Sequence, residues 1–110
     1  MPRTKKKPEI EIPPAPEHLS VRGRLLWGAL APTAARSVER QTLLQAALEA
    51  LDRADAAREQ VEREGPTFVT ATTGAVHVHP MLKVEKEARM QFVRIWDLLN
   101  LRSNDERSAQ

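Results

Sequence analysis

Two histidines separated by a single residue, His77 and His79, are the strongest candidates in the sequence for metal chemistry. Imidazole nitrogens bind transition metals well, but a protein site usually takes three or four ligating side chains. The chain has one other histidine, His18, and no cysteine. Carboxylates would have to complete such a site. We therefore expect exposed or hydrogen-bonded strand histidines, and we predict no metal-ligating residue.

The rest of the sequence lacks the residue patterns that are typical of catalysis. Its four glycines are isolated, and none precedes the Lys-Ser or Lys-Thr pair of a phosphate-binding loop. Acidic residues between positions 37 and 65 alternate with arginines, which is typical of a solvated or interface surface. We therefore predict a protein that is not an enzyme, with no catalytic residue and no cofactor.

Basic residues near the N-terminus indicate polyanion binding. Residues 1–18 are rich in proline and lysine, and proline fixes φ and removes hydrogen-bond donors, so we expect a flexible arm. Residues 20–36 carry three arginines and no acid, whereas residues 37–65 carry seven acids and four arginines. The predicted DNA-binding residues are Arg3, Lys5, Lys6, Lys7, Arg22, Arg24 and Arg36. A solubilising arm and an ordinary charged surface explain the same pattern equally well.

Composition limits the class of protein. A chain of 110 residues with formal charge +2 is long enough for one domain. The lack of cysteine excludes disulfides, and no apolar run is long enough to span a bilayer. The basic N-terminus has no apolar stretch of the kind found in signal peptides. We therefore expect an intracellular protein without a membrane partner.

The element that organises the chain is a long helix between Ser37, a good N-cap, and Gly65, a good C-terminal cap. No proline or glycine interrupts it, and its leucines and alanines recur three or four residues apart. A straight helix of this length would be about 42 Å long. That exceeds what a small compact core needs.

Shorter elements flank this helix. A helix is expected over residues 19–30, connected to the long helix through residues 31–36. The β-branched residues 67–73 and 75–79, with Gly74 between them, predict a β-hairpin. A last helix over residues 81–99 would return antiparallel to the long one. The expected fold is mainly α, with an arm at 1–18, a helical domain at 19–101 and a polar tail at 102–110.

Assembly into a homo-oligomer is the next prediction. The chain has only four aromatic residues, and many of its apolar positions are alanine, so one copy has few bulky side chains to bury. We expect the apolar stripes of the long and last helices to meet other copies. The predicted interface residues are Leu44, Leu48, Leu51, Phe92, Ile95 and Leu99.

The order of these segments resembles the small terminase subunit of tailed phages, in the branch typical of lambda-like phages and prophages. The landmarks are Pro13-Pro14-x-Pro16-x-x-Leu19-Ser20, Trp27, the long helix ending at Gly65-Pro66, Thr73-Gly74, His79-Pro80 and Leu98-Leu99-Asn100-Leu101. The chain differs from the family in two places. The family often has Asn-Pro at the position of His79-Pro80, and often ends with Gly-Leu-Thr-Pro.

The resemblance implies a non-catalytic packaging factor that assembles as a ring in the host cell cytoplasm. It implies that this factor binds double-stranded viral DNA and presents it to the large terminase subunit, which carries the ATPase and nuclease. Two alternatives stay open. A small DNA-binding regulator would need an element that reads a DNA groove, and a structural adaptor would not bind nucleic acid.

Overall fold

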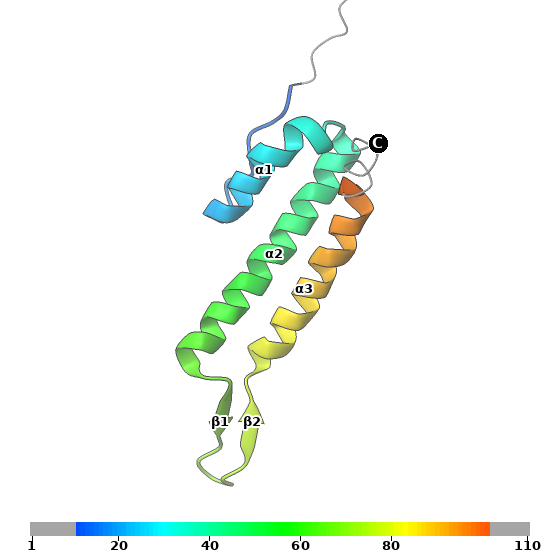
Figure 1. Cartoon of the computed structure of the whole chain (residues 1–110). Helices are drawn as coiled ribbons and strands as arrows, with labels where there is room; N and C mark the ends of the chain where they lie inside the picture. The colour runs from blue at the N-terminus through cyan, green and yellow to red at the C-terminus, as the bar shows by residue number, and fades with distance from the viewer. Residues whose placement is uncertain (1–10, 102–110) are drawn as a thin grey trace, which may run out of the picture.

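The chain folds into three helices and one β-hairpin, as the computed structural model of residues 11–101 shows (Figure 1). The elements in order are α1 (Val21–Ala34), α2 (Val38–Glu64), β1 (Thr67–Val69), β2 (Val76–Val78) and α3 (Pro80–Leu99). The mainly α architecture and the antiparallel return of the last helix are therefore confirmed. In this part of the chain, no helix combines the length and the apolar character needed to cross a membrane.

The long helix α2 begins and ends at the residues that the sequence indicated. The Ser37 side chain accepts a hydrogen bond from the backbone N–H of Arg40 at 3.1 Å, which caps the first turn. At the other end Gly65 has a φ of 89°, and its N–H donates to the Val61 carbonyl at 2.7 Å. Positive φ favours glycine, so this residue allows the chain to leave the helix and enter the hairpin.

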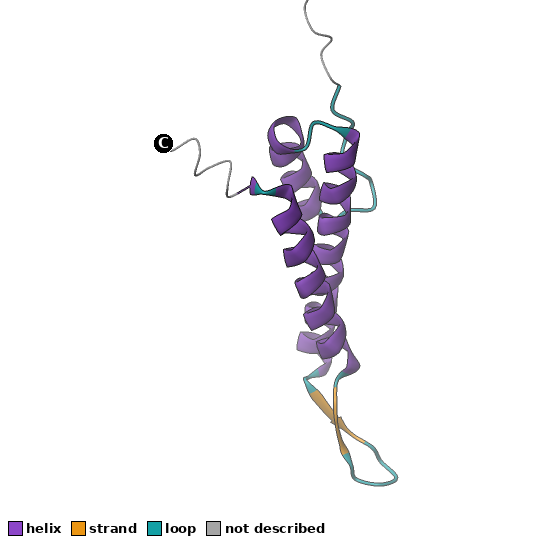
Figure 2. Ribbon diagram, turned by 90° about the vertical axis from the view of Figure 1, so that its right-hand side faces the viewer, coloured by secondary structure: helices purple, strands orange, loops and turns teal. Residues whose placement is uncertain are grey.

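The hairpin projects beyond the ends of α2 and α3 and has no helix over either face (Figure 2). Its antiparallel register pairs Thr67 with Val78, Phe68 with His77 and Val69 with Val76. The strands are three residues each, shorter than expected, because residues 70–75 form the turn. Within that turn, the N–H of Gly74, at a φ of 72°, donates to the Thr70 carbonyl at 2.7 Å.

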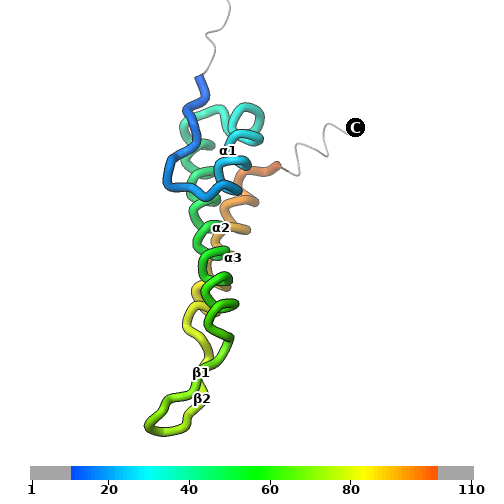
Figure 3. The backbone as a smooth tube through the Cα atoms, turned by 90° about the vertical axis from the view of Figure 1, so that its left-hand side faces the viewer, coloured from blue at the N-terminus to red at the C-terminus, as the bar shows by residue number. Residues whose placement is uncertain are grey.

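Helix α1 lies against the upper half of α2, and the segment before it runs back along it (Figure 3). The indole N–H of Trp27 donates to the Pro13 carbonyl at 3.0 Å and ties that segment to the helix. The helix runs to Ala34, four residues beyond its expected end at Leu30. Pro32 lies inside its last turn and cannot donate the backbone hydrogen bond to Gly28 that another residue would make there.

The core of the chain lies where α1, α2 and the end of α3 meet. Its buried members are Leu19, Trp27, Ala31, Ala35, Leu44, Leu48, Leu51 and Leu99. Phe92 packs against it from α3, with its ring centroid 4.9 Å from that of Trp96. Farther along, α2 presents alanines to α3, which lets the two helices lie close together over most of their length.

This core buries four of the six predicted interface residues within one chain, whereas Phe92 and Ile95 are partly exposed. Leu44, Leu48, Leu51 and Leu99 are at most 2% exposed within a single chain, so their side chains are not available to another copy. Helical periodicity identified the apolar face correctly. The surface that covers it comes from the same chain, because α1 and α3 both pack onto α2.

Candidate nucleic-acid interface

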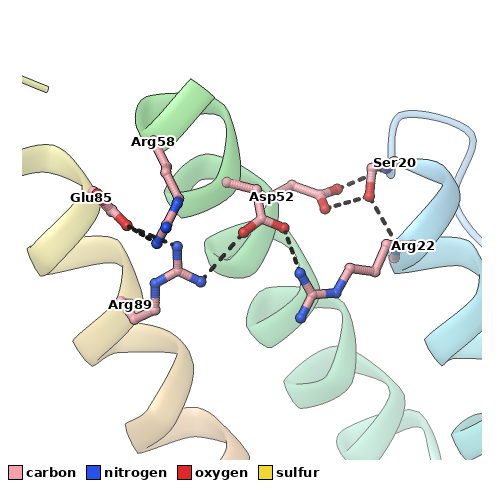
Figure 4. Close-up of polar contacts among 8 residues, drawn as sticks. Ser20, Arg22, Asp52, Arg58, Glu85 and Arg89 are labelled. Carbon is pink, nitrogen blue, oxygen red and sulfur yellow. Dashed lines mark hydrogen bonds and ion pairs between the residues drawn. The ribbon is translucent and has the colours of Figure 1, made fainter. Parts of the chain in front are cut away.

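A row of carboxylates on α2 holds the start of α1 in place. Glu49, Asp52 and Asp55 follow one another at intervals of three residues, so they form a ridge along one side of the helix. His18 Nε2 lies 2.7 Å from Glu49 Oε2. The backbone N–H and the hydroxyl of Ser20 donate to the two carboxylate oxygens of Asp52 at 2.8 and 2.6 Å. We call these contacts the α1 clamp, and Figure 4 shows its bonds between Ser20 and Asp52.

The third acid of the ridge, Asp55, connects all three helices. One of its oxygens accepts a hydrogen bond from Arg22 of α1 at 3.1 Å, and the other accepts one from Arg89 of α3 at 3.3 Å (Figure 4). Arg89 also donates to Glu85 at 3.0 Å, one turn earlier on α3. Arg58 of α2 lies 3.8 Å from the same Glu85. The clamp thus continues as an ion-pair network across the molecule.

The position of Gly23 explains why α1 can lie so close to the ridge. A Cβ atom on this residue would lie 3.2 Å from the Leu19 Cβ and 3.3 Å from an oxygen of Asp52. Gly28 has no such neighbour, because nothing lies within 4 Å of its hypothetical Cβ. The first glycine therefore serves the α1–α2 contact, whereas the second only lowers helix propensity.

The clamp also changes the acidity of one of its members. Hydrogen bonds from the Gln45 amide and then from His18 lower the pKa of Glu49 below its ordinary value. Both bonds favour the charged carboxylate, and their effect exceeds the opposing effect of partial burial. Glu49 is thus a charged acceptor at neutral pH. The acidic ridge of α2 therefore binds the start of α1, which belongs to the same chain.

The predicted DNA-binding cations divide into three groups. Arg22 belongs to the clamp network through Asp55. Arg24 and Arg36 are exposed, and neither makes an ion pair with another residue in the range 11–101. Arg3, Lys5, Lys6 and Lys7 lie outside the described residues. Arg24 lies near the start of α1 and Arg36 lies two residues beyond its last residue, Ala34, so roughly 15 Å of helix separates Arg24 from that end.

The two histidines considered for metal binding have different roles. The His77 ring stacks on Phe68 across the hairpin, with ring centroids 5.1 Å apart. His79 lies one residue beyond β2, is 7% exposed, and caps α3: its Nδ1 accepts from the Met81 N–H at 3.0 Å. The expected strand position is therefore correct for His77 and wrong for His79, which lies beyond the end of β2. Residues 11–101 contain no cluster of three or more His, Cys, Asp or Glu side chains that could hold a metal ion.

His79 also joins the two long helices. Because Nδ1 accepts a hydrogen bond, Nε2 carries the proton of the neutral ring and donates to Glu64 at 2.6 Å. The backbone N–H of His79 donates to the Pro66 carbonyl at 2.8 Å. The bond from His79 lowers the pKa of Glu64 below its ordinary value. This one residue ties the end of α2, the base of the hairpin and the start of α3 together.

The exposed apolar side chains mark surfaces that the sequence pattern missed. Val21 and Leu25 on α1 are 69% and 70% exposed, and Val93 and Leu98 on α3 are 51% and 64% exposed. Leu25 and Leu98 each stand next to another leucine in the sequence, so hydropathy alone does not show which of the two side chains is exposed. No family model, curated protein or solved structure matches the chain.

Proposed function

We propose that the chain is a non-catalytic small terminase subunit, which binds double-stranded viral DNA and presents it to the large subunit for genome packaging. The proposal rests on the structural positions of the residues that resemble the family. Gly65-Pro66 follows the last residue of α2, His79-Pro80 begins α3, and Asn100, at a φ of 59°, caps the end of α3. The residues that resemble the family thus lie where the long helices of the fold begin or end.

DNA contact is assigned to one region of the molecule. Arg24 lies near the start of α1 and Arg36 just beyond its end, and residues 11–18, the described part of the arm, run along the same helix (Figure 3). Lys5, Lys6 and Lys7 would extend this basic surface. A few cations on one copy bind DNA weakly, so binding is strong only when several copies contact one duplex.

A closed ring of copies in the host cell cytoplasm supplies that multivalency. Its subunit contacts involve exposed apolar residues such as Val21, Leu25 and Leu98, because the leucines of α2 are covered within one chain. The large subunit contributes ATP hydrolysis and DNA cleavage. This assignment needs no active site and no cofactor in the present chain.

The salt dependence of DNA binding tests the proposal. Replacing Lys5, Lys6 and Lys7 together with Ala should reduce the slope of log affinity against log salt, by about 0.9 for each phosphate that the variant no longer neutralises. Arg24→Ala should weaken binding, whereas Arg22→Ala, the matched control two residues away, should change it less because Asp55 already pairs with that arginine. Absence of DNA binding by the parent protein at low salt would contradict the proposal.

A further inference from the structure

The side of α3 that faces away from α2 carries an exposed stripe of mixed character. Apolar residues occupy its middle, where Met90 is 47% and Val93 is 51% exposed. The buried residues of the helix, Ala88 and Leu99, lie on the opposite side. We call this stripe the outer face of α3, and its members are Lys83, Lys86, Glu87, Met90, Val93, Arg94 and Asp97.

Two shallow hollows lie next to each other in the middle of this face. Arg89, Met90, Val93 and Arg94 line the first. Glu87, Met90, Gln91 and Arg94 line the second. Met90 and Arg94 separate the two hollows, because both residues line each of them. A side chain from another helix could therefore seat on either side of this ridge.

The order of the charges along this face is complementary to that of the same face on an antiparallel copy. Lys83 lies seven residues before Met90, and Asp97 lies seven residues after it. Glu87 and Arg94 are also seven residues apart, so they lie on the same edge of the face. An antiparallel copy centred near Met90 would place Arg94 across from Glu87, and Lys83 across from Asp97.

We propose that the outer face of α3 pairs with the same face of a second copy, antiparallel, about a two-fold axis beside Met90. The two-fold axis repeats each pairing, so four ion pairs cross the interface, each with one partner from either copy, and Met90 and Val93 pack in the centre. Nucleic acid fits this face less well, because Glu87 and Asp97 would repel phosphates. The pairing does not depend on the proposed function, and it would join two chains or two rings.

Charge reversal in the full chain tests the pairing. Glu87→Arg and Arg94→Glu should each place like charges opposite one another and weaken the dimer at least about tenfold. The double variant E87R/R94E restores opposite charges and should return to within about threefold of the parent. Sedimentation over a concentration series measures this, and circular dichroism checks that each variant is folded. The pairing would be overturned if the single variants associate like the parent, or if the double variant stays dissociated.

A cysteine cross-link locates the axis independently. The chain has no cysteine, so Met90→Cys introduces a single thiol that, near a two-fold axis, meets its own copy. Mild oxidation should convert most of this variant to a disulfide-linked dimer. Leu25→Cys on α1, 70% exposed, is the matched control and should form little disulfide-linked dimer. Equal cross-linking of both variants, or protection of the Met90→Cys thiol by duplex DNA, would overturn the proposal without affecting the DNA-binding test above.

Discussion

The hydrogen bond from His79 to Glu64, 2.6 Å long, closes the junction between the two long helices. The same imidazole caps α3 through its other nitrogen. A residue that resembles a metal ligand in the sequence is thus a structural element of the hairpin base. Its neighbour in the pattern, His77, lies on the exposed hairpin.

Replacement of this histidine should lower stability. His79→Ala removes the helix cap and leaves Glu64 without its donor, at an expected cost of about 1–2 kcal/mol in the free energy of unfolding. His79→Asn keeps a capping side chain and should cost less. Urea denaturation measures both, with His77→Ala as the control at an exposed position. If His77→Ala lowers the free energy of unfolding as much as His79→Ala does, the structural role of His79 is contradicted.

The pH dependence of stability should report the same hydrogen bond. The lowered pKa of Glu64 means that its contribution is fully present above the ordinary glutamate value of 4.5 and disappears as pH falls through the folded-state value. The free energy of unfolding should therefore fall more steeply below pH 4.5 in the parent than in Glu64→Gln. Urea titrations at a series of acidic pH values test this. Identical slopes would show that the carboxylate gains nothing on folding.

The two glycines of α1 should differ in how much an alanine at each position stabilises the chain. Gly28→Ala meets open space and should raise the free energy of unfolding by up to about 1 kcal/mol through helix propensity. Gly23→Ala gains the same propensity but crowds Leu19 and Asp52, so it should be the less stable of the two variants. Thermal unfolding ranks them. If Gly23→Ala were the more stable variant, the α1 clamp would accommodate the added methyl group at little cost.

A charge in the α2 core should unfold the chain. Leu48→Asp places an unpaired carboxylate at a position with no exposure, and we expect the free energy of unfolding to fall by at least about 4 kcal/mol. Leu25→Asp, at an exposed site, should leave the fold intact. Circular dichroism distinguishes the two. A folded Leu48→Asp chain that only changes its oligomeric state would show that Leu48 lies between subunits after all.

Local signals in the sequence predicted most of the fold. The caps at Ser37 and Gly65 gave the ends of α2 correctly, because they act within one turn of the helix. The hairpin was expected from β-branched residues around Gly74, but its strand lengths depend on turn hydrogen bonds that composition does not specify. The end of α1 was missed because residues 31–36, which include Pro32, were assigned to the connection, whereas the helix continues to Ala34.

The candidate site was harder to predict because its contacts join distant residues. Ser20 and Asp52 are 32 positions apart, and nothing local to either residue indicates the other. Helical periodicity found the leucines of α2, but it cannot say whether the covering surface comes from the same chain or from another copy. A basic residue such as Arg22 likewise gives no sign in the sequence that Asp55 pairs with it.

Native mass spectrometry of the full chain, with and without a DNA duplex, tests the proposed function most directly. We expect a single closed oligomer of more than two copies that gains the mass of one duplex when DNA is added. Multivalent contact should make the DNA complex more resistant to added salt than any binding by an isolated copy. A monomer or dimer that never acquires the duplex would contradict the proposed function.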